Sequence, residues 1–334
     1  MRGVTAQVYE DGRRLALGAG ASSVHWVGGE ALYALNDGAV LIAASEGEMR
    51  RISAHDGVIL CAALHPDGRH LVTGGDDGAL KSVAPDGAVV TLAELRKWVD
   101  HVVTSAVSGV IVASAGKDAV VFKGGGEAHR FTHSSTIGGL ALDSKGRRLA
   151  AAHYGGVTMR LALAPDDKGN VLKWAGSHLA VTISPEGDYV VTGMQENALH
   201  GWRLPEKTDL RMDGYPAKTK SFSWDKRGRW LATSGANAAI VWPFAGRLGP
   251  QGKPPLQPGD RGVLVTAVAF HPTDEVLAIG YADGAAIVAR FTDNMGMELD
   301  EPGEGAVTAL AWAPDGKSIA IGDEAGRGAI VNVG

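Results

Sequence analysis

Short apolar runs separated by tight turns cover almost the whole chain. In the clearest stretch, residues 178–204, three such runs are separated by the turn Ser184-Pro185-Glu186-Gly187 and by a polar corner at 193–197. Runs this short, rich in β-branched and aromatic residues and bounded by Pro and Gly, are typical of strands rather than helices. A fourth run at 208–212 completes the unit, so the pattern predicts a four-stranded antiparallel sheet.

The turn between the first two strands of this unit recurs along the chain. The equivalent positions are Gly29, Gly68, Gly109, Gly146, Gly187, Gly228, Asp274 and Gly316. Their spacing gives a period of about 40 to 45 residues, which with four strands per period is typical of a β-propeller. We therefore expect eight four-stranded blades. The first and third copies are the weakest, so seven blades are the alternative.

Three copies carry a resemblance to a known family. They are LHPDGRHLVTGGDDGALKSV from Leu64, ISPEGDYVVTGMQENALHGW from Ile183 and SWDKRGRWLATSGANAAIVW from Ser223. On these motifs the chain resembles the WD40-repeat family, as a divergent, bacterial-type member, and the resemblance spans nearly all of the chain. No copy ends in the Trp-Asp pair that is typical of the family. The resemblance implies an all-β fold, a single closed WD40-like β-propeller.

The period divides residues 1–334 into the blades of one domain. We expect blades at about 24–52, 58–92, 99–131, 137–174, 179–212, 218–258, 263–299 and 306–333. The last copy supplies only three strands, and an unpaired apolar strand at 13–17 precedes the first copy. We therefore expect residues 13–17 to complete the last blade, because this pairing removes two exposed sheet edges.

Composition narrows the class of protein. The 334 residues are 45% hydrophobic, yet no stretch approaches the length of a membrane span, and the first residues lack the apolar core of a signal peptide. A net charge of −5 provides no cationic surface for phosphates. We therefore expect a monomeric, cytoplasmic protein that binds neither nucleic acid nor membrane. The single Cys61 lies in an apolar run, where we expect a buried, unreactive side chain.

The resemblance also implies a structural hydrogen-bond network in the second copy. His55 stands where the family has its structural histidine, and Thr73 and Asp77 match the second-strand hydroxyl residue and the corner aspartate. The resemblance implies that these three side chains are bonded to one another. Val83 replaces the tryptophan that the family has in the third strand, so we expect a truncated network.

Function in a propeller is expected in the loops, because the strands are scaffold. Most corners between second and third strands are small, but in copies four to six the corners and the loops that follow carry aromatic, Met and ionisable residues. We expect a protein or peptide to bind there, with Tyr154 and Tyr215 as exposed aromatic anchors. The predicted contact residues are His153, Tyr154, His178, Met194, Gln195, Glu196, Tyr215 and Lys218.

Other function classes stay open at this point. His153, His178 and Glu196 could supply the nitrogen and oxygen ligands of a zinc site, although none of them has the local spacing that makes such a prediction specific. The chain has no nucleophile elbow and no His-Glu-x-x-His. We expect a non-catalytic scaffold without a cofactor. The alternative is a small-ligand or metal-binding propeller, with or without enzymatic activity, that uses the same histidines and carboxylate.

Overall fold

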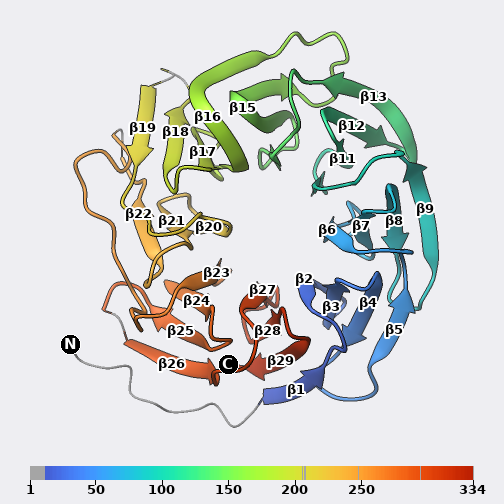
Figure 1. Ribbon diagram of the computed structural model, residues 1–334, viewed down its shortest axis with the longest axis vertical. Coiled ribbons are helices and arrows are strands. Elements are labelled where there is room, and N and C mark those ends of the chain that lie inside the picture. Colours follow the sequence, from blue (N-terminus) through green and yellow to red (C-terminus); the bar gives the residue numbers. More distant parts are fainter. Residues whose placement is uncertain (1–11, 205, 207, 247, 294, 334) are drawn as a thin grey trace. The chain divides into compact units, whose positions relative to one another are not determined.

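The computed structural model describes residues 12–204, 206, 208–246, 248–293 and 295–333, which form strands and turns only (Figure 1). No helix capable of crossing a membrane occurs in this part of the chain. The start of the chain, where the sequence predicts no signal peptide, lies outside the described residues. The expected all-β class is confirmed.

The chain is divided into two compact units. The first unit comprises the described parts of Met1–Tyr33, Ile42–Met49 and Tyr215–Gly334, and the second comprises Ala34–Leu41 and Arg50–Gly214. Within each unit, strands that follow one another in the sequence are hydrogen-bonded neighbours in antiparallel sheets. This order is the meander that the repeat predicts.

Three sheets belong to the first unit. The first has the order β1-β29-β28-β27, the second β20-β21-β22 and the third β23-β24-β25-β26. An isolated bridge between Val241 and Leu256 extends the three-stranded sheet. The strands are β1 (Gly12–Ala16), β20 (Phe222–Trp224), β21 (Trp230–Thr233), β22 (Ile240–Pro243), β23 (Val265–Phe270), β24 (Val276–Tyr281), β25 (Ala286–Arg290), β26 (Met295–Asp300), β27 (Val307–Trp312), β28 (Ser318–Asp323) and β29 (Arg327–Asn332).

Three further sheets belong to the second unit, with the orders β6 to β9, β10 to β13 and β14 to β19. Their strands are β6 (Ile59–Leu64), β7 (Leu71–Gly75), β8 (Ala79–Val83), β9 (Val89–Glu94), β10 (Val102–Ser105), β11 (Val110–Ala115), β12 (Asp118–Lys123), β13 (Gly126–Thr132), β14 (Gly139–Leu142), β15 (Arg148–Leu161), β16 (Asn170–Ile183), β17 (Tyr189–Met194), β18 (Leu199–Arg203) and β19 (Thr208–Met212). The remaining sheet is formed by β2 (Ala21–Val27), β3 (Glu30–Leu35), β4 (Ala39–Ala43) and β5 (Arg50–Ser53).

The number of sheets differs from the expected number of blades. The described strands form seven hydrogen-bonded sheets. The prediction of eight separate four-stranded blades is therefore wrong, and the alternative of seven is the number observed. The reason is β16, which runs without interruption from the last strand of one predicted blade into the first strand of the next (Figure 1). Both copies therefore lie in one six-stranded sheet. The weak copy around Gly109 is not the cause, because it forms the complete sheet β10 to β13.

The recurring turns have the chemistry that the sequence predicts. Gly68 and Gly187 have φ angles of 69° and 78°, in the left-handed region that glycine adopts at little cost. In the second of these turns, Ser184 Oγ accepts the N–H groups of Asp188 at 3.1 Å and Tyr189 at 3.0 Å. The side chain thus satisfies backbone donors at the start of β17 and fixes the hairpin register.

Neighbouring sheets of each unit pack their apolar faces together. In the second unit, one core combines Val110 and Val121 of the sheet β10 to β13 with Leu140 and Ala151 of the next sheet. In the first unit, a comparable core combines Ala278 of β24 with Ile319 of β28. Cys61 is half-buried rather than fully buried, and burial of its thiol raises the pKa well above the ordinary value, so the thiol stays protonated.

The predicted pairing of the first and last strands is confirmed. Strand β1 pairs antiparallel with β29 from Gly12 opposite Val331 to Ala16 opposite Arg327. Leu15 and Leu17 are 6% and 0% exposed, and the Leu17 N–H donates to the Gly326 carbonyl at 2.8 Å. The start of the described chain therefore contributes backbone hydrogen bonds and apolar burial to its last sheet.

Deleting residues 1–18 should destabilise the protein strongly. The two buried leucines alone correspond to about 3 to 6 kcal/mol of lost burial, and the deletion also leaves β29 as an unpaired edge. We expect a lower melting temperature by calorimetry, with aggregation on heating. The single change Leu17→Ala should cost about 2 to 5 kcal/mol. Its matched control is Leu163→Ala, at an exposed leucine; equal melting temperatures for the deletion and the parent would refute the role of β1.

Candidate functional site

The histidine of the second copy, His55, is buried and bonded through both ring nitrogens. Its Nδ1 lies 3.0 Å from the Asp77 carboxylate, and its Nε2 lies 2.9 Å from Thr73 Oγ1. Burial alone would raise the pKa of Asp77, but hydrogen bonds from the Ala79 N–H and from His55 outweigh burial and lower that pKa. The three side chains that the resemblance implies as a network are therefore joined through His55 and tie the loop before β6 to the corner after β7.

A buried threonine of the second strand has the same role in two other copies. Thr192 Oγ1 lies 2.8 Å from His178 Nδ1, and Thr233 Oγ1 lies 2.7 Å from the Tyr215 hydroxyl. The Trp242 Nε1–H also donates to the Tyr215 hydroxyl at 2.7 Å. Tyrosine therefore replaces histidine in one of these networks, a substitution that residue type alone does not reveal.

Half of the predicted contact residues are buried. Exposure is 6% for His153, 1% for His178, 4% for Met194 and 7% for Tyr215. The expectation that Met194 and Tyr215 are exposed is wrong. The Tyr215 hydroxyl bonds the buried Thr233, and Met194 is the last residue of β17, a strand that is buried throughout. The structure thus removes Tyr215 as an exposed anchor.

The other predicted contact residues are exposed, and three of them lie on two adjacent corners. Tyr154 is 69% exposed, and it pairs with Ser177 in the ladder between β15 and β16. The Gln195 N–H donates to the Ser177 carbonyl at 3.0 Å, so the corner that carries Gln195 and Glu196 lies beside that of Tyr154. Lys218 is also exposed, but it belongs to the first unit.

The alternative zinc ligands have no free nitrogen. His153 Nδ1 lies 2.9 Å from the Tyr154 carbonyl and Nε2 lies 2.7 Å from Thr158 Oγ1. His178 Nε2 lies 3.1 Å from the Trp174 carbonyl, while its Nδ1 faces Thr192. Both imidazoles thus hold their corners through hydrogen bonds of both ring nitrogens.

Among the described residues, one other group has ligand atoms close enough for a cation: His65, Asp67 and His70, in the turn between β6 and β7. The Asp67 carboxylate lies 3.0 Å from His65 Nδ1 and 2.6 Å from His70 Nδ1. Burial alone would raise the pKa of Asp67, but hydrogen bonds from the Arg69 N–H and from the two histidines outweigh burial and lower it to about 2. The three side chains already stabilise the turn by bonding one another.

A cavity of about 670 Å³ opens in the second unit beside Tyr154. The end of β13 and the loop after it supply Thr132, His133 and Ser134, and β15 supplies His153, Tyr154, Thr158 and Arg160. The loop between β15 and β16 supplies Lys168, and β16 supplies Val171, Lys173 and Trp174. We refer to this cavity as the β15–β16 pocket.

The register of β15 and β16 decides which side chains reach the pocket. Thr158 lies opposite Val171 and Gly156 opposite Lys173, and Arg160 lies two residues beyond Thr158 on the same face. The alternate residues Val157, Met159 and Leu172 are buried in the core. Glycine is required at position 156, because a Cβ there would lie 2.1 Å from the Leu172 carbonyl oxygen.

Two side chains of the pocket carry buried nitrogen atoms without a hydrogen-bond partner, His133 Nε2 and Arg160 Nε. Burial, together with the charges of His153 and Arg160, lowers the pKa of His133 to about 4, so His133 is neutral at pH 7. The Arg160 guanidinium lies 4.7 Å from the centre of the Phe131 ring and donates to the Asp167 carbonyl.

Sequence reasoning identified Tyr154 and His153 in this pocket but missed His133, Arg160, Lys173 and Trp174. His133 precedes Gly146 by the same number of residues as His55 precedes Gly68, so the repeat could have revealed it. No repeat position could have revealed Arg160 or Lys173, because their proximity depends on how β15 pairs with β16.

Similarity to solved structures extends over most of the chain. The computationally designed Ika8 protein has a TM-score of 0.77 and 16% identity, with 94% of this chain and 96% of that chain covered. A chain of the Mitotic Checkpoint Complex has a TM-score of 0.67 and 14% identity, with 82% and 86% covered. At such identities the likeness shows the fold alone, and that fold is a β-propeller.

Two family models match parts of the sequence. The model described as anaphase-promoting complex subunit 4 WD40 domain matches residues 268–334, and that described as WD domain, G-beta repeat matches residues 46–82. Among curated proteins, none matches the chain. Together with the fold, these two partial matches support a WD40-repeat propeller, a kind of protein that is commonly a protein-interaction scaffold.

The buried Tyr215 gives a direct test of the corner networks. Tyr215→Phe keeps the ring but removes the oxygen that Trp242 and Thr233 contact, leaving buried polar groups unpaired. We expect it to reduce the free energy of unfolding by about 1 to 3 kcal/mol in urea denaturation. Lys218→Ala, at an exposed side chain a few residues further along the chain, is the control and should have little effect. A fully stable Tyr215→Phe protein would contradict the network.

The low pKa of His133 gives a pH prediction. Unfolded histidine takes up a proton at a pH of about 6.5, whereas folded His133 does so only at about pH 4. The unfolded state therefore binds more protons between these values, and the His133 contribution makes unfolding easier as the pH falls through that window. We expect His133→Gln to lose less stability than the parent between pH 7 and pH 5, and an NMR titration to find the lowered pKa. An ordinary histidine titration would contradict it.

Proposed function

We propose that this protein is a non-catalytic scaffold that binds a protein or peptide partner at the β15–β16 pocket. Tyr154 carries the proposal, since its ring is 69% exposed and lines a cavity of about 670 Å³. Protein interfaces obtain most of their affinity from a few aromatic anchors that become buried in well-packed pockets. Tyr154 offers such an anchor, with the exposed Gln195 and Glu196 on the adjacent corner.

Exposed apolar side chains on the same elements support this proposal. Val171 of β16 lines the pocket and is 44% exposed, and Leu179 of the same strand is 39% exposed. Leu161 at the end of β15 and Leu163 in the following loop are 52% and 46% exposed. Several large apolar side chains exposed on two paired strands favour a contact surface for another macromolecule.

Catalysis is supported less well by the same residues. His153 is bonded to the Thr158 hydroxyl, a pairing that could activate a nucleophile. However, Thr158 is only 6% exposed, and the other nitrogen of His153 contacts a backbone carbonyl instead of a carboxylate. The pair therefore fits a structural role in the corner. A binding role explains more of the pocket's features than a catalytic role does.

Tyr154→Ala should weaken partner binding without affecting folding. Loss of an aromatic anchor costs about 2 kcal/mol or more, which corresponds to about a 30-fold increase in Kd. The measurement is affinity purification with tagged full-length protein, followed by titration of each recovered partner. Melting temperature should be unchanged, because the ring lies mostly in solvent.

The matched control is Val107→Ala, which shortens a 76% exposed apolar side chain in the connection between β10 and β11. We expect it to retain every partner. A photo-crosslinking amino acid at position 154 should capture the same partner, whereas one at position 107 should not. Retention of all partners by Tyr154→Ala, with loss in Val107→Ala, would place the contact surface elsewhere and reject the proposal.

A further inference from the structure

The charged residues of the β15–β16 pocket all have one sign. Arg160, Lys168 and Lys173 line it, and its lining contains no Asp or Glu. This excess of positive charge occurs in a protein whose net charge is −5. Three cations around one cavity, without a counter-charge in its wall, favour an anionic ligand.

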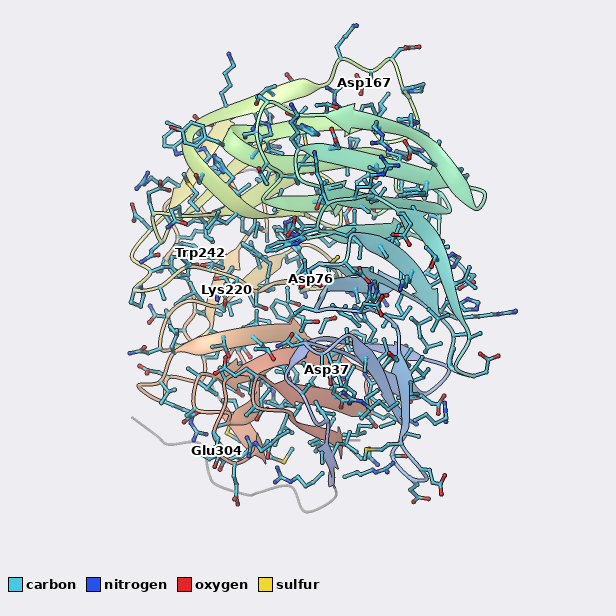
Figure 2. The ribbon with its side chains drawn as sticks, turned by 45° about the vertical axis from the view of Figure 1, so that its right-hand side comes forward. Asp37, Asp76, Asp167, Lys220, Trp242 and Glu304 are labelled. Atoms are coloured by element: carbon cyan, nitrogen blue, oxygen red, sulfur yellow. The ribbon has the colours of Figure 1, made fainter. Side chains whose placement is uncertain are left out.

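No ion pair among the described residues joins these three cations to a carboxylate, although Asp167 lies close enough to Arg160 for their charges to interact. Asp167 lies in the loop between β15 and β16 (Figure 2), and its carboxylate accepts the N–H groups of Leu161 at 2.5 Å and Gly169 at 3.0 Å. Asp118 accepts a hydrogen bond from the Thr132 hydroxyl at 2.7 Å. None of the ion pairs formed by the described residues involves the ammonium group of Lys168 or Lys173.

A second, independent observation is the pair of unsatisfied polar atoms. His133 is 7% exposed, lines the pocket, and has no hydrogen-bond partner at Nε2. Arg160 Nε is likewise buried without a partner. A buried polar group left without a partner destabilises a protein, so the wall of this pocket carries polar groups that the fold leaves unsatisfied.

We propose that the β15–β16 pocket binds the carboxylate side chains of an acidic peptide segment of the partner. The inference rests on the proposed function and names the chemistry of that partner. Carboxylates would pair with Arg160, Lys168 and Lys173, and an apolar side chain of the same segment would contact Tyr154 and Val171. Arg160 also offers the planar guanidinium that pairs well with a carboxylate.

The arrangement of the cations favours a peptide over other polyanions. Arg160 lies at the end of β15, Lys168 in the loop and Lys173 in β16, so the charges are distributed along two strands instead of surrounding a single point. Such spacing suits several carboxylates on an extended chain. A nucleic acid requires a larger cationic surface than three residues of an acidic protein provide.

The test begins with a library of random peptides displayed on phage and selected on the immobilised full-length protein. We expect the selected peptides to be enriched in Asp and Glu next to an apolar residue. A synthetic peptide of a selected sequence is then titrated by calorimetry, beside a copy in which Asn and Gln replace the acids. The amide copy should bind at least about tenfold more weakly.

Charge reversal in the pocket supplies the matched variants. Lys168→Glu combined with Lys173→Glu should weaken binding of the acidic peptide at least about tenfold, because the attraction becomes repulsion. Both side chains are exposed, so the fold should persist. The control is Lys145→Glu, the same change at an exposed lysine in the turn between β14 and β15, and it should bind the peptide as the parent does.

Other outcomes would overturn the inference. Equal binding of the acidic and amide peptides would remove the role of charge. Tighter binding of a phosphoserine copy, or of a single-stranded oligonucleotide, would show that the pocket selects phosphate. If Tyr154→Ala abolishes partner binding while the charge-reversed protein keeps it, the acidic-ligand inference fails and the scaffold function stands. If neither variant affects the partner, the proposed function fails as well.

Discussion

Each sheet of this protein is too small to form a core alone, and this constraint shapes the structure. A sheet of four short strands has two apolar faces, and water must be excluded from both. Neighbouring sheets of a unit therefore share their cores, as Val121 of β12 and Leu149 of β15 do. Small residues such as Ala113 and Ala151 suit this arrangement, because they let two sheets approach closely.

Side chains at the corners connect the strands within a sheet. A buried hydroxyl in the second strand bonds a side chain from an earlier part of the same copy, and the partner is His55, His178 or Tyr215 in different copies. The geometry is conserved within the molecule while the residue type varies. Because each corner uses its polar side chain for folding, most aromatic and histidine residues near the corners are unavailable to a ligand.

The β15–β16 pocket differs from the other corners, because some of its buried polar groups have no hydrogen-bond partner. The glycines at positions 155 and 156 make a corner without an inward side chain, and Tyr154 beside them is exposed. His133 Nε2 has no hydrogen-bond partner, whereas both nitrogens of His55 are bonded. Polar groups left unsatisfied by the fold, beside three cations and an exposed ring, are more informative about binding than the variation of the loops.

The sequence by itself determined the strands, the turns and the order of pairing. Apolar runs bounded by Gly and Pro are local signals, and Gly68 and Gly187 occupy the turns that their spacing predicts. The pairing of β1 with β29 was also predictable, because an unpaired strand at each end of a repeat requires a partner. These features depend on local residue preferences and on the number of strands in each repeat.

Tertiary structure decided which of the predicted contact residues are accessible. Tyr154 and Tyr215 look alike in the sequence, yet one is 69% exposed and the other 7%. The difference arises because Tyr215 meets Thr233 and Trp242, both distant in the sequence. The grouping of the cations at the pocket and the merging of two copies into one sheet through β16 likewise depend on strand pairing. A local pattern of residue types does not encode that pairing.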